Sequence, residues 1–453
     1  MHTLSHRIAS FTSALTLETL PQDVLEKAKV CLLNAYGMGL DCHDTPYAPI
    51  ARRAVLAMEG EVKEGATLLG DGRRTTVGGA CLANAALFHG RAQEDTCGAA
   101  HFGTILIPLL TALVETRRIT LDRLIPALVA GYEAGGLLEN AFAGATTPNG
   151  FRSTTTYGVV AAAASVSRLL GLDAATTATA LANAVSFTGG VLQSFSDGSD
   201  EWRYQPGLAA RNGLAAAELA RAGSFAAPHA FEGKTGFAAA FARRDCDVDT
   251  LAGKLGTDWS IHRVTFKPFP VCAFNQTPVT AALELRRMLA GAPIRSVAVR
   301  MNPYECGYAG MDAVGPFNSI SGTLMSIPFC IALTLVHGVP DMARMTTYDD
   351  AAVNGLVARV KLVPDANVPT LSAVLEAETV DGRRLVREQP MTPADFSYDR
   401  AGTSALVRRI GREQAVPPEA HDLIEAFVDK LPAGSIGDVL KAFALLERHR
   451  AAA

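Results

Sequence analysis

The hydrophobic pattern of the chain changes near Phe266, and this change limits the folds that are open to it. Before Phe266, apolar residues recur at helical spacing over long stretches. After Phe266, short stretches alternate between apolar and polar residues, as strands do when one face is buried. The chain has 453 residues, which is too many for one ordinary hydrophobic core. We therefore expect two domains of different type, with the boundary near Phe266.

Residues 1–265 are expected to form one helix after another. The segments with the clearest helical spacing are 20–40, 104–116, 121–134, 157–170 and 174–185. Alanine crowds this part of the chain, for example at Ala161–Ala164 and Ala215–Ala217. Small residues on facing helices let the helix axes approach closely, so this part predicts a tight helical bundle.

Residues 266–399 combine strand and helix patterns. The expected strands are 294–301, 356–363, 373–379 and 384–388, and the expected helices are 278–289 and 321–335. Asp381-Gly382 lies between the last two strands and is a strong hairpin signal. This pattern predicts a smaller α+β domain with a mainly antiparallel sheet.

The helical pattern returns near the C-terminal end, at 418–430 and 436–448. Helices at this place are expected to pack back onto the first domain. The predicted fold class is thus mainly α, with a large all-helical bundle domain and a smaller α/β lid domain with an antiparallel sheet. The bundle is expected to comprise 1–265, completed by 400–453, and the lid domain to comprise 266–399.

Charge and composition exclude several classes of partner. The formal net charge is -4, and no long run of either sign occurs, which argues against nucleic acid or an anionic membrane surface. No stretch reaches the roughly 18 apolar residues that span a bilayer. No Gly-rich dinucleotide motif follows a strand and no phosphate-binding loop occurs, so a nucleotide cofactor has no support.

The eight cysteines contain no C-x-x-C pair, and no histidine pair has zinc-like spacing. Free thiols in a reducing compartment explain this usage, and the N-terminus lacks the pattern of a signal peptide. We therefore expect a cytoplasmic protein without a bound metal.

Two histidines, two acids and a hydroxyl lie within the 13 residues from His89 to His101. A histidine beside a carboxylate is a general acid or base near neutral pH, and loops beside a rigid bundle often carry such groups. In the alternative reading, Asp95 and Thr96 only cap the backbone of a loop.

A second stretch, Asn149–Gly158, places four hydroxyl residues in front of a predicted helix. Their hydroxyl groups and the N-terminus of the helix can bind an anion, and the Arg152 guanidinium can bind a carboxylate through two parallel hydrogen bonds. A plain helix cap is the alternative. A third stretch, Asp197–Gly207, is a polar loop with Trp, Arg and Tyr, which is either functional or a solvated connection between helices.

A fourth stretch, Phe266–Ala273, has two prolines that stiffen the backbone where the pattern changes. Lys267 is a candidate base or carboxylate partner, and Cys272 is a candidate acid. The alternative is a structural linker with a packed thiol.

Taken in order, these four stretches resemble the MmgE/PrpD family over residues 5 to 440. That family includes 2-methylcitrate dehydratases, cis-aconitate decarboxylases and iminodisuccinate epimerases. Further landmarks of the resemblance are Gly131-Tyr132-Glu133, Leu169–Leu172, Gln205-Pro206-Gly207, Glu232–Phe237 and Lys267–Pro270.

The resemblance implies a cofactor-independent homodimer with its active site in a cleft between a helical and an α/β domain. The family's Asp-Asp-Thr and following His match Glu94-Asp95-Thr96 and His101, so Thr96 and His101 carry over. The family's active-site Lys in Lys-Pro-Tyr-Pro matches Lys267.

Other family positions differ here. The earlier Asp of the first loop falls near Ala92, the His of Gly-Phe-His falls at Arg152, and the Lys before Gln-Pro-Gly falls at Trp202, beside Arg203. A position that is His in the decarboxylase matches Cys272, and a late Tyr falls near Phe329. Arginine stays protonated and is a poor base. Compared with the family, we therefore expect the substrate class to be the same but the reaction to differ.

These residues predict proton abstraction next to a carboxylate of a small di- or tricarboxylic acid. His101 is expected to move the proton, with Thr96 and Asp95 orienting it or the substrate. Tyr157 or Cys272 is expected to be the second acid or base. Arg152, Arg203 and Lys267 are expected to hold carboxylates and developing charge. Gln205 and Ser153 complete the predicted substrate contacts.

A lyase of the dehydratase or decarboxylase type is the first reading of this chemistry. An epimerase or isomerase of a dicarboxylic acid is the second, because it needs the same proton abstraction. A non-catalytic carboxylate-binding homologue is the third.

Overall fold

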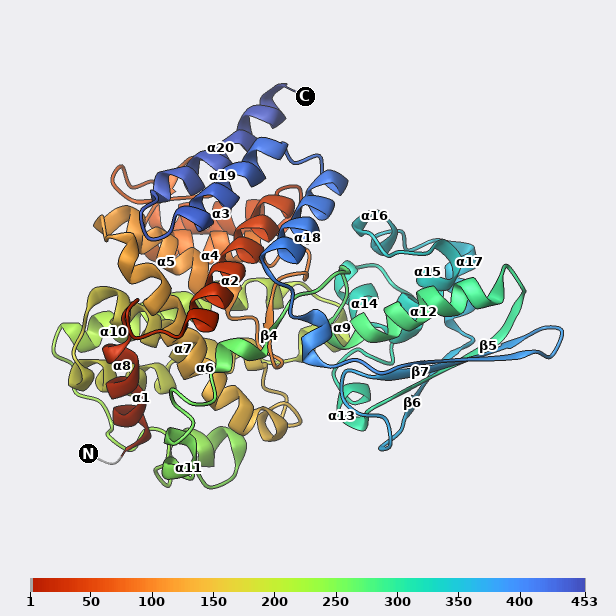
Figure 1. Cartoon of the computed structure of the whole chain (residues 1–453), viewed down its shortest axis with the longest axis horizontal. Coiled ribbons are helices and arrows are strands. Elements are labelled where there is room, and N and C mark those ends of the chain that lie inside the picture. Colours follow the sequence, from red (N-terminus) through yellow and green to blue (C-terminus); the bar gives the residue numbers. More distant parts are fainter. Residues whose placement is uncertain (1–2, 453) are drawn as a thin grey trace. The chain divides into compact units, whose positions relative to one another are not determined.

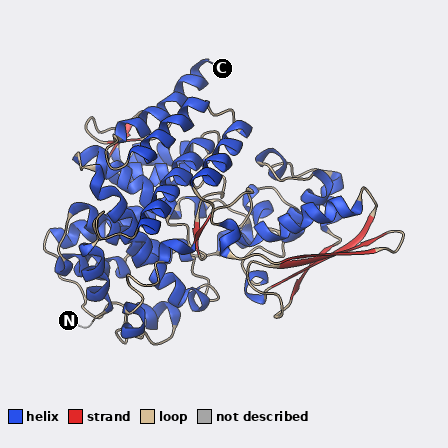
Figure 2. Cartoon of the chain, in the orientation of Figure 1, coloured by secondary structure: helices blue, strands red, loops and turns tan. Residues whose placement is uncertain are grey.

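The computed structural model describes residues 3–452, and it describes side chains up to residue 447. The chain divides into two compact units. The first unit holds the residues up to Gly190, Arg203–Phe266 and the residues from Tyr398 onward, and the second holds Val191–Trp202 and Lys267–Ser397. Figure 1 traces the elements of both units along the chain, and Figure 2 shows how strongly helices dominate. The predicted mainly-α class is confirmed, whereas the domain ranges drawn from the sequence stay a prediction.

The first unit is built from helices. They are α1 (Leu4–Ala14), α2 (Gln22–Asp41), α3 (Tyr47–Glu59), α4 (Val77–Phe88), α5 (Gly103–Arg117), α6 (Leu124–Thr146), α7 (Ser153–Leu170), α8 (Ala174–Ser186), α10 (Gln205–Arg221), α11 (Val248–Ala252), α18 (Arg400–Glu413), α19 (Pro418–Lys430) and α20 (Ile436–Ala452). Two short strand pairs accompany them, β1 (Ala66–Thr67) with β2 (Arg74–Thr75) and β3 (Thr96–Cys97) with β4 (Val264–Thr265).

Small residues determine how closely these helices pack. Helix α7 packs against α6 and α10, and the four alanines Ala161–Ala164 are fully buried there. A methyl group added at Gly213 of α10 would collide with the Cβ of Ala162. The bundle therefore depends on residues without bulky side chains at the helix crossings.

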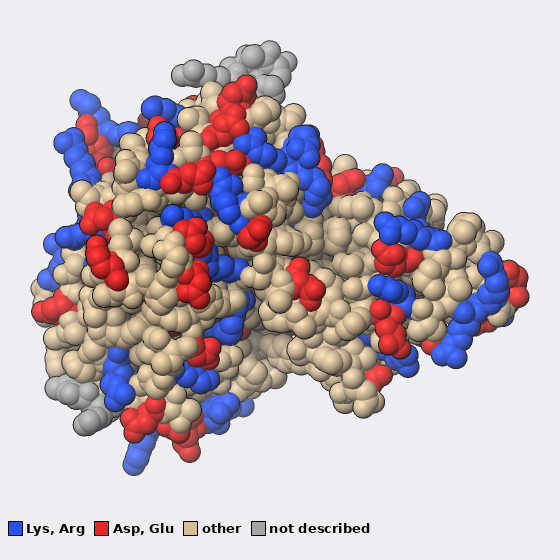
Figure 3. Space-filling model, viewed as in Figure 1, with Lys and Arg blue, Asp and Glu red and all other residues tan. Residues whose placement is uncertain are grey.

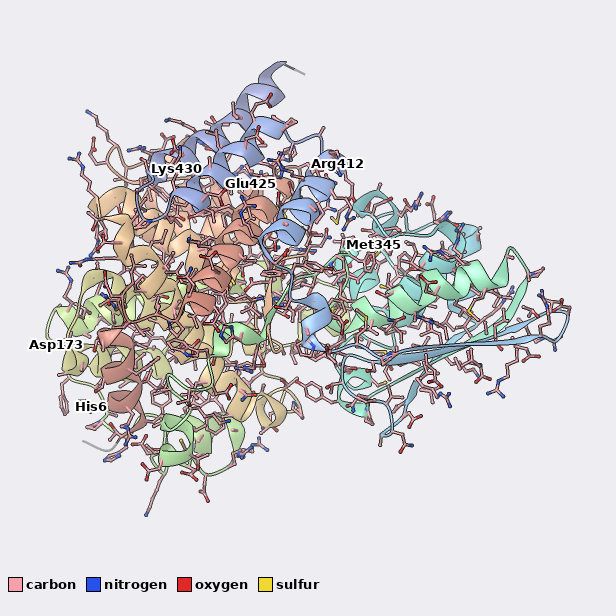
Figure 4. All side chains as sticks on the ribbon, in the orientation of Figure 1. His6, Asp173, Met345, Arg412, Glu425 and Lys430 are labelled. Carbon is pink, nitrogen blue, oxygen red and sulfur yellow. The ribbon has the colours of Figure 1, made fainter. Side chains whose placement is uncertain are left out.

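The C-terminal helices belong to this unit. Helices α18 and α19 pack against α2, and Val407, Ile424 and Phe427 are fully buried. Glu425, labelled in Figure 4, links the two helices because its carboxylate accepts hydrogen bonds from Ser404 and from Arg408, the latter at 2.8 Å.

The second unit has a four-stranded sheet with helices packed against it. The strands are β5 (Ile294–Met301), β6 (Val360–Pro364), β7 (Ala373–Thr379) and β8 (Arg384–Gln389), in the order β6-β5-β7-β8. The helices are α9 (Gln193–Asp197), α12 (Gln276–Leu289), α13 (Pro303–Cys306), α14 (Ile320–Met325), α15 (Ile327–His337), α16 (Met342–Met345) and α17 (Ala351–Val357). Helix α12 contacts β7 and β8, and α15 contacts β6. Buried side chains such as Val297, Val299 and Leu375 alternate with more exposed neighbours along β5 and β7.

The sheet is mainly antiparallel, as predicted, with one exception. Strand β5 pairs with β7 and β7 with β8 in antiparallel fashion, but β5 and β6 are parallel. The chain between β5 and β6 runs through α13 to α17, and a connection of this length allows a parallel return. The predicted hairpin is present at Gly382, where φ is +87°.

The helix expected at 121–134 is longer than predicted, since α6 continues to Thr146. Three other local predictions were wrong. The single helix expected at 321–335 is two helices, because Ser326 caps α15 through the backbone N–H of Phe329. The strand expected from Leu356 begins at Val360, since Leu356 still belongs to α17. The four hydroxyl residues expected in front of a helix form its first turn, as α7 begins at Ser153.

Among the residues that the structure describes, no helix combines the length and the apolar character needed to cross a bilayer. On the face shown in Figure 3, basic and acidic side chains are interspersed. This mixture agrees with the absence of long charge runs in the sequence.

Candidate active site

The segment His89–His101 connects α4 to α5, and we call it the histidine loop. Its second half is a tight turn, because the backbone groups of Cys97 and Ala100 bond to each other at 2.8 and 3.2 Å. Strand β3 anchors the turn to β4, and the hydroxyl oxygens of Thr96 and Thr265 lie 2.7 Å apart. The predicted site residue Thr96 thus has a defined place in the first unit.

Two features hold the tip of the turn. Gly98 has a φ of +61°, and a Cβ at this position would collide with the carboxylate of Glu139. The same carboxylate accepts a hydrogen bond of 2.9 Å from the backbone of Ala99 and pairs with Arg263 at 3.4 Å. Burial raises the pKa of Glu139, and these contacts oppose that effect.

Asp95 makes two kinds of contact. Its side chain anchors the loop, and its backbone carbonyl holds His101. Its carboxylate accepts hydrogen bonds from the Tyr132 hydroxyl at 2.6 Å and from the backbone of Gly103 at 3.3 Å. Its carbonyl oxygen lies 2.8 Å from Nδ1 of His101. Because a carbonyl oxygen only accepts, Nδ1 of His101 carries a proton. The remaining ring nitrogen, Nε2, is therefore the one that changes its protonation in acid–base chemistry.

Glu94 lies between the two histidines of the loop. Its Oε1 is 3.1 Å from Nδ1 of His89 and 3.3 Å from Nδ1 of His101. The centroids of the two imidazole rings are 5.4 Å apart. The side chain of Glu94 is 1% exposed, so its interaction with both rings is screened little by water.

Arg152 approaches this group from the N-terminus of α7. Its guanidinium lies 2.8 Å from Nε2 of His89 and donates to Oε1 of Gln205 at 3.2 Å. A guanidinium only donates, so Nε2 of His89 accepts and the ring is neutral, with its proton on Nδ1 towards Glu94. Burial lowers the pKa of His89 to about 4, and the nearby charges of Arg152 and Arg203 also lower it while Glu94 opposes them.

Arg203 holds the start of the loop. Its guanidinium donates to the carbonyl oxygens of His89 at 3.0 Å and Gly90 at 2.7 Å, and it lies 3.9 Å from the centroid of the Tyr47 ring. Arg152 is 1% exposed and Arg203 is 0% exposed. The substrate contacts predicted for both stay a prediction, and their burial favours a positioning role.

The other predicted residues of the first unit lie on or near α7. Ser153 is buried in the first turn, and the next residue, Thr154, accepts a hydrogen bond of 3.3 Å from the backbone of His101. Tyr157 is fully buried, its hydroxyl lies 2.7 Å from that of Thr146, and its ring packs against Phe237. This environment is typical of a core tyrosine, and the acid–base role of Tyr157 stays a prediction.

Lys267 and Cys272 belong to the second unit. Lys267 is 3% exposed. Burial raises the pKa of the Cys272 thiol, and the charge of Lys267 acts in the opposite direction. The roles predicted for these two residues stay predictions.

The structure thus brings together four predicted residues, His101, Asp95, Arg152 and Gln205, around two that the sequence did not single out. His89 was visible only as a member of an unusual loop composition, and Glu94 only through that composition and as the first residue matched to the family's Asp-Asp-Thr. Their spacing in the sequence did not predict that they meet. Glu94 contacts His101 because the chain turns at Gly98. Within residues 3–452, no group of three or more His, Cys, Asp or Glu side chains is arranged to hold a metal ion.

Comparison with known families identifies the family of this chain. The MmgE/PrpD N-terminal domain matches residues 6–248, and the MmgE/PrpD C-terminal domain matches residues 269–408. The chain belongs to the MmgE/PrpD family. The resemblance noted in the sequence is thereby confirmed.

Several relatives with assigned names are similar to this chain. A cis-aconitate decarboxylase of Aspergillus terreus is 26% identical over 367 residues, which is 76% of this chain and 74% of the relative. The cis-aconitate decarboxylase-like protein oryM of Aspergillus oryzae is 32% identical over 227 residues, or 48% of this chain and 46% of the relative. The human cis-aconitate decarboxylase is 28% identical over 218 residues, covering 46% and 44%.

Proposed function

We propose that this protein is an enzyme, a lyase of the decarboxylase or dehydratase type that acts on a small di- or tricarboxylic acid. The names of its relatives support the reaction class. The single observation that carries the proposal is the setting of His101. Its Nδ1 is held by the Asp95 carbonyl and by Glu94, and its side chain is 16% exposed while Glu94 and His89 are buried.

In the proposed step, Nε2 of His101 exchanges a proton with the carbon next to a substrate carboxylate. In a dehydration, neutral imidazole takes the proton from that carbon, and the C–O bond on the neighbouring carbon breaks to release water. In a decarboxylation, the bond from that carbon to its carboxylate breaks to release CO2, and imidazolium gives a proton to the carbanion-like carbon that remains. The negative charge that develops on the substrate is then delocalised into the carboxylate. Nearby cationic side chains lower the energy of such a state.

Epimerisation is the second candidate. It uses the same proton abstraction, followed by reprotonation on the opposite face, and therefore needs a second proton-transfer group. Tyr157 and Cys272 are the candidates that the sequence offers for this role.

A non-catalytic carboxylate-binding protein is the third candidate. The observation that favours it is the replacement of the family's His and Lys by Arg152 and Trp202. Trp202 is buried, and its indole N–H donates to the Ser321 hydroxyl at 3.0 Å, so it makes a packing contact rather than an acid–base contact.

Proton exchange in D2O, followed by NMR, tests the proposal. The protein is incubated separately with citrate, 2-methylcitrate, cis-aconitate and iminodisuccinate. We expect deuterium incorporation or product formation with at least one acid. We expect His101→Gln to slow it by about 100-fold or more.

The matched control is His262→Gln, since His262 is a partly exposed histidine of the same unit that pairs with Asp23. This variant is expected to retain the wild-type rate. Binding of these acids without exchange or turnover in the wild type would reject the enzyme and favour the binding protein.

A further inference from the structure

Four side chains of the first unit form a continuous chain of contacts, in the order Arg152, His89, Glu94, His101. The successive distances are 2.8 Å, 3.1 Å and 3.3 Å. Arg152, His89 and Glu94 are at most 1% exposed, whereas the His101 side chain is 16% exposed. The chain therefore runs from a buried cation to the one member that reaches solvent.

Each member has only one way to place its protons. Arg152 only donates, so His89 accepts at Nε2 and carries its proton on Nδ1. The Asp95 carbonyl only accepts, so His101 also carries its proton on Nδ1. Oε1 of Glu94 thus lies within ion-pair distance of the protonated Nδ1 of both rings, at 3.1 and 3.3 Å, and an ionised carboxylate is the charge that both N–H dipoles favour.

Arg152 determines where the charge of Glu94 acts. With Nε2 of His89 occupied by the guanidinium, a second proton on this ring would have to face a permanent cation at 2.8 Å. His89 therefore stays neutral and does not neutralise Glu94. The negative charge of Glu94 also acts on His101, because Nδ1 of that ring lies 3.3 Å from Oε1.

We propose that Glu94 is a positioning residue that raises the proton affinity of His101, whose tautomer the Asp95 carbonyl fixes, and that Arg152 makes this possible by holding His89 neutral. The effect on catalysis rests on the proposed function. The effect of Glu94 on the proton affinity of His101 does not. An anionic partner on Nδ1 strengthens Nε2 as a proton acceptor and stabilises the imidazolium.

Other charged or titratable groups also face this chain of contacts. Arg203 lies at the carbonyl of His89 and lowers the pKa of that ring. The Asp95 carboxylate is directed to Tyr132, and its presence raises the pKa of the Tyr132 hydroxyl beyond the effect of burial. Neither group bonds to Nδ1 of His101, so the carboxylate that a test must change is Glu94.

The test is 15N NMR of histidine-labelled full-length protein without substrate, recorded between pH 5 and 9. In the wild type we expect both rings to be protonated on Nδ1 when neutral, and His89 to remain neutral over the whole range. In Glu94→Gln the charge is lost but the acceptor oxygen is kept. The titration midpoint of His101 is then expected to move to lower pH by about one unit, a tenfold change in proton affinity.

Glu139→Gln is the matched control. Glu139 is also buried and also supports the histidine loop, but through Ala99 and not through a histidine. It is expected to leave the midpoint and tautomer of His101 unchanged. Arg152→Met is expected to let His89 titrate within the observed range, and to lower the His101 midpoint in the same direction as Glu94→Gln.

A wild-type spectrum in which His89 is charged at pH 6, or carries its proton on Nε2, would overturn the proposal even if no variant folds. An unchanged His101 midpoint in Glu94→Gln would also overturn it. The kinetic consequence, if the enzyme is active, is a decrease of about 10- to 100-fold in kcat/KM for Glu94→Gln, with the acid limb of the pH profile moved to lower pH. If the NMR spectra are as expected but no acid is turned over, the role of Glu94 stands and the proposed function is rejected.

Discussion

Asp95 shows how a residue predicted to be catalytic can act through its backbone. Its carboxylate is engaged by Tyr132 and Gly103, and its carbonyl oxygen holds His101. Asp95→Asn keeps that carbonyl and leaves an oxygen for Tyr132. We therefore expect a loss of about 1–2 kcal/mol in the free energy of unfolding, since a charged hydrogen bond becomes neutral.

The same variant is expected to retain kcat/KM within about tenfold, because Nε2 of His101 is unaffected. Urea unfolding and steady-state kinetics measure the two effects. A decrease in kcat/KM of about 1,000-fold with normal stability would instead assign proton transfer to the Asp95 carboxylate.

Glu305 of α13 makes the stability of the second unit depend on pH. Its side chain is 1% exposed, and burial raises its pKa to about 7 from an ordinary value near 4.5, although Oε1 accepts a hydrogen bond of 2.8 Å from the backbone of Leu371. The folded state thus binds this proton more tightly than the unfolded state. Its contribution is fully present below about pH 4.5 and is lost as the pH rises through 7.

Glu305→Gln removes this dependence and keeps the oxygen for Leu371. Relative to the wild type, we expect the variant to gain up to about 3 kcal/mol of unfolding free energy between pH 5 and pH 8. Denaturant titrations at the two pH values measure the gain. Glu284→Gln, at an exposed position on α12, is the control and should show no such trend. An equal response of both variants would contradict the assignment.

At the scale of elements, hydrophobic periodicity and the turn residues between periodic segments predicted most of the fold. Strand β5 begins and ends where the alternation of Ile294–Met301 does, and α8 ends within one residue of the expected bound. The errors lie where one side chain changes the local hydrogen bonding. Ser326 interrupts an apolar stretch that periodicity alone joins into one helix, and Asp350 caps α17 and delays the start of β6. Such caps depend on tertiary placement that a single sequence does not specify.

The turn of the histidine loop requires glycine at position 98. Its φ is +61°, and an added methyl would meet the Glu139 carboxylate. Gly98→Ala is expected to lower the free energy of unfolding by about 1–3 kcal/mol and to reduce activity by displacing His101. Thermal melting and the D2O exchange rate measure both.

The control is Gly144→Ala on α6, where a Cβ meets nothing within 4 Å and φ is not in the left-handed region. This change should stabilise the protein by up to about 1 kcal/mol, because alanine is the better helix former. If both variants destabilise the protein equally, the turn is not the cause.

At the scale of the whole molecule, the sequence located the loop of the site but not its internal pairing. Composition drew attention to 89–101, and the family resemblance selected Thr96 and His101. The buried contact of Arg152 with His89 was not predictable, because it joins residues 63 positions apart that meet only in the folded bundle. The alternative of a substrate contact for Arg152 was equally consistent with its sequence position.

The C-terminal helices are required for the first unit to fold. Leu406, Val407, Ile410, Ile424, Phe427 and Phe443 are buried, and the rings of Phe427 and Phe443 pack on Tyr36 and Phe88 with centroids about 6 Å apart. Each such side chain contributes about 1.5–3 kcal/mol by leaving water, so their joint loss, about 10 kcal/mol or more, is comparable to the whole stability of a typical domain.

A chain that ends at Ser397 is therefore expected to aggregate or to lack a cooperative thermal transition, and to show no D2O exchange. Co-expression of residues 398–453 as a separate chain supplies the missing surface and should restore both, because the contacts are side-chain packing and not chain connectivity. Protection of the α2, α6 and α7 amides from hydrogen exchange in the shortened chain would mean that α1 to α11 form a sufficient core, whereas a cooperative transition by itself would not, because this chain retains the second unit. The helices α18 to α20 would then act on the histidine loop only locally, through the pairing of Arg91 with Glu413 at 3.1 Å.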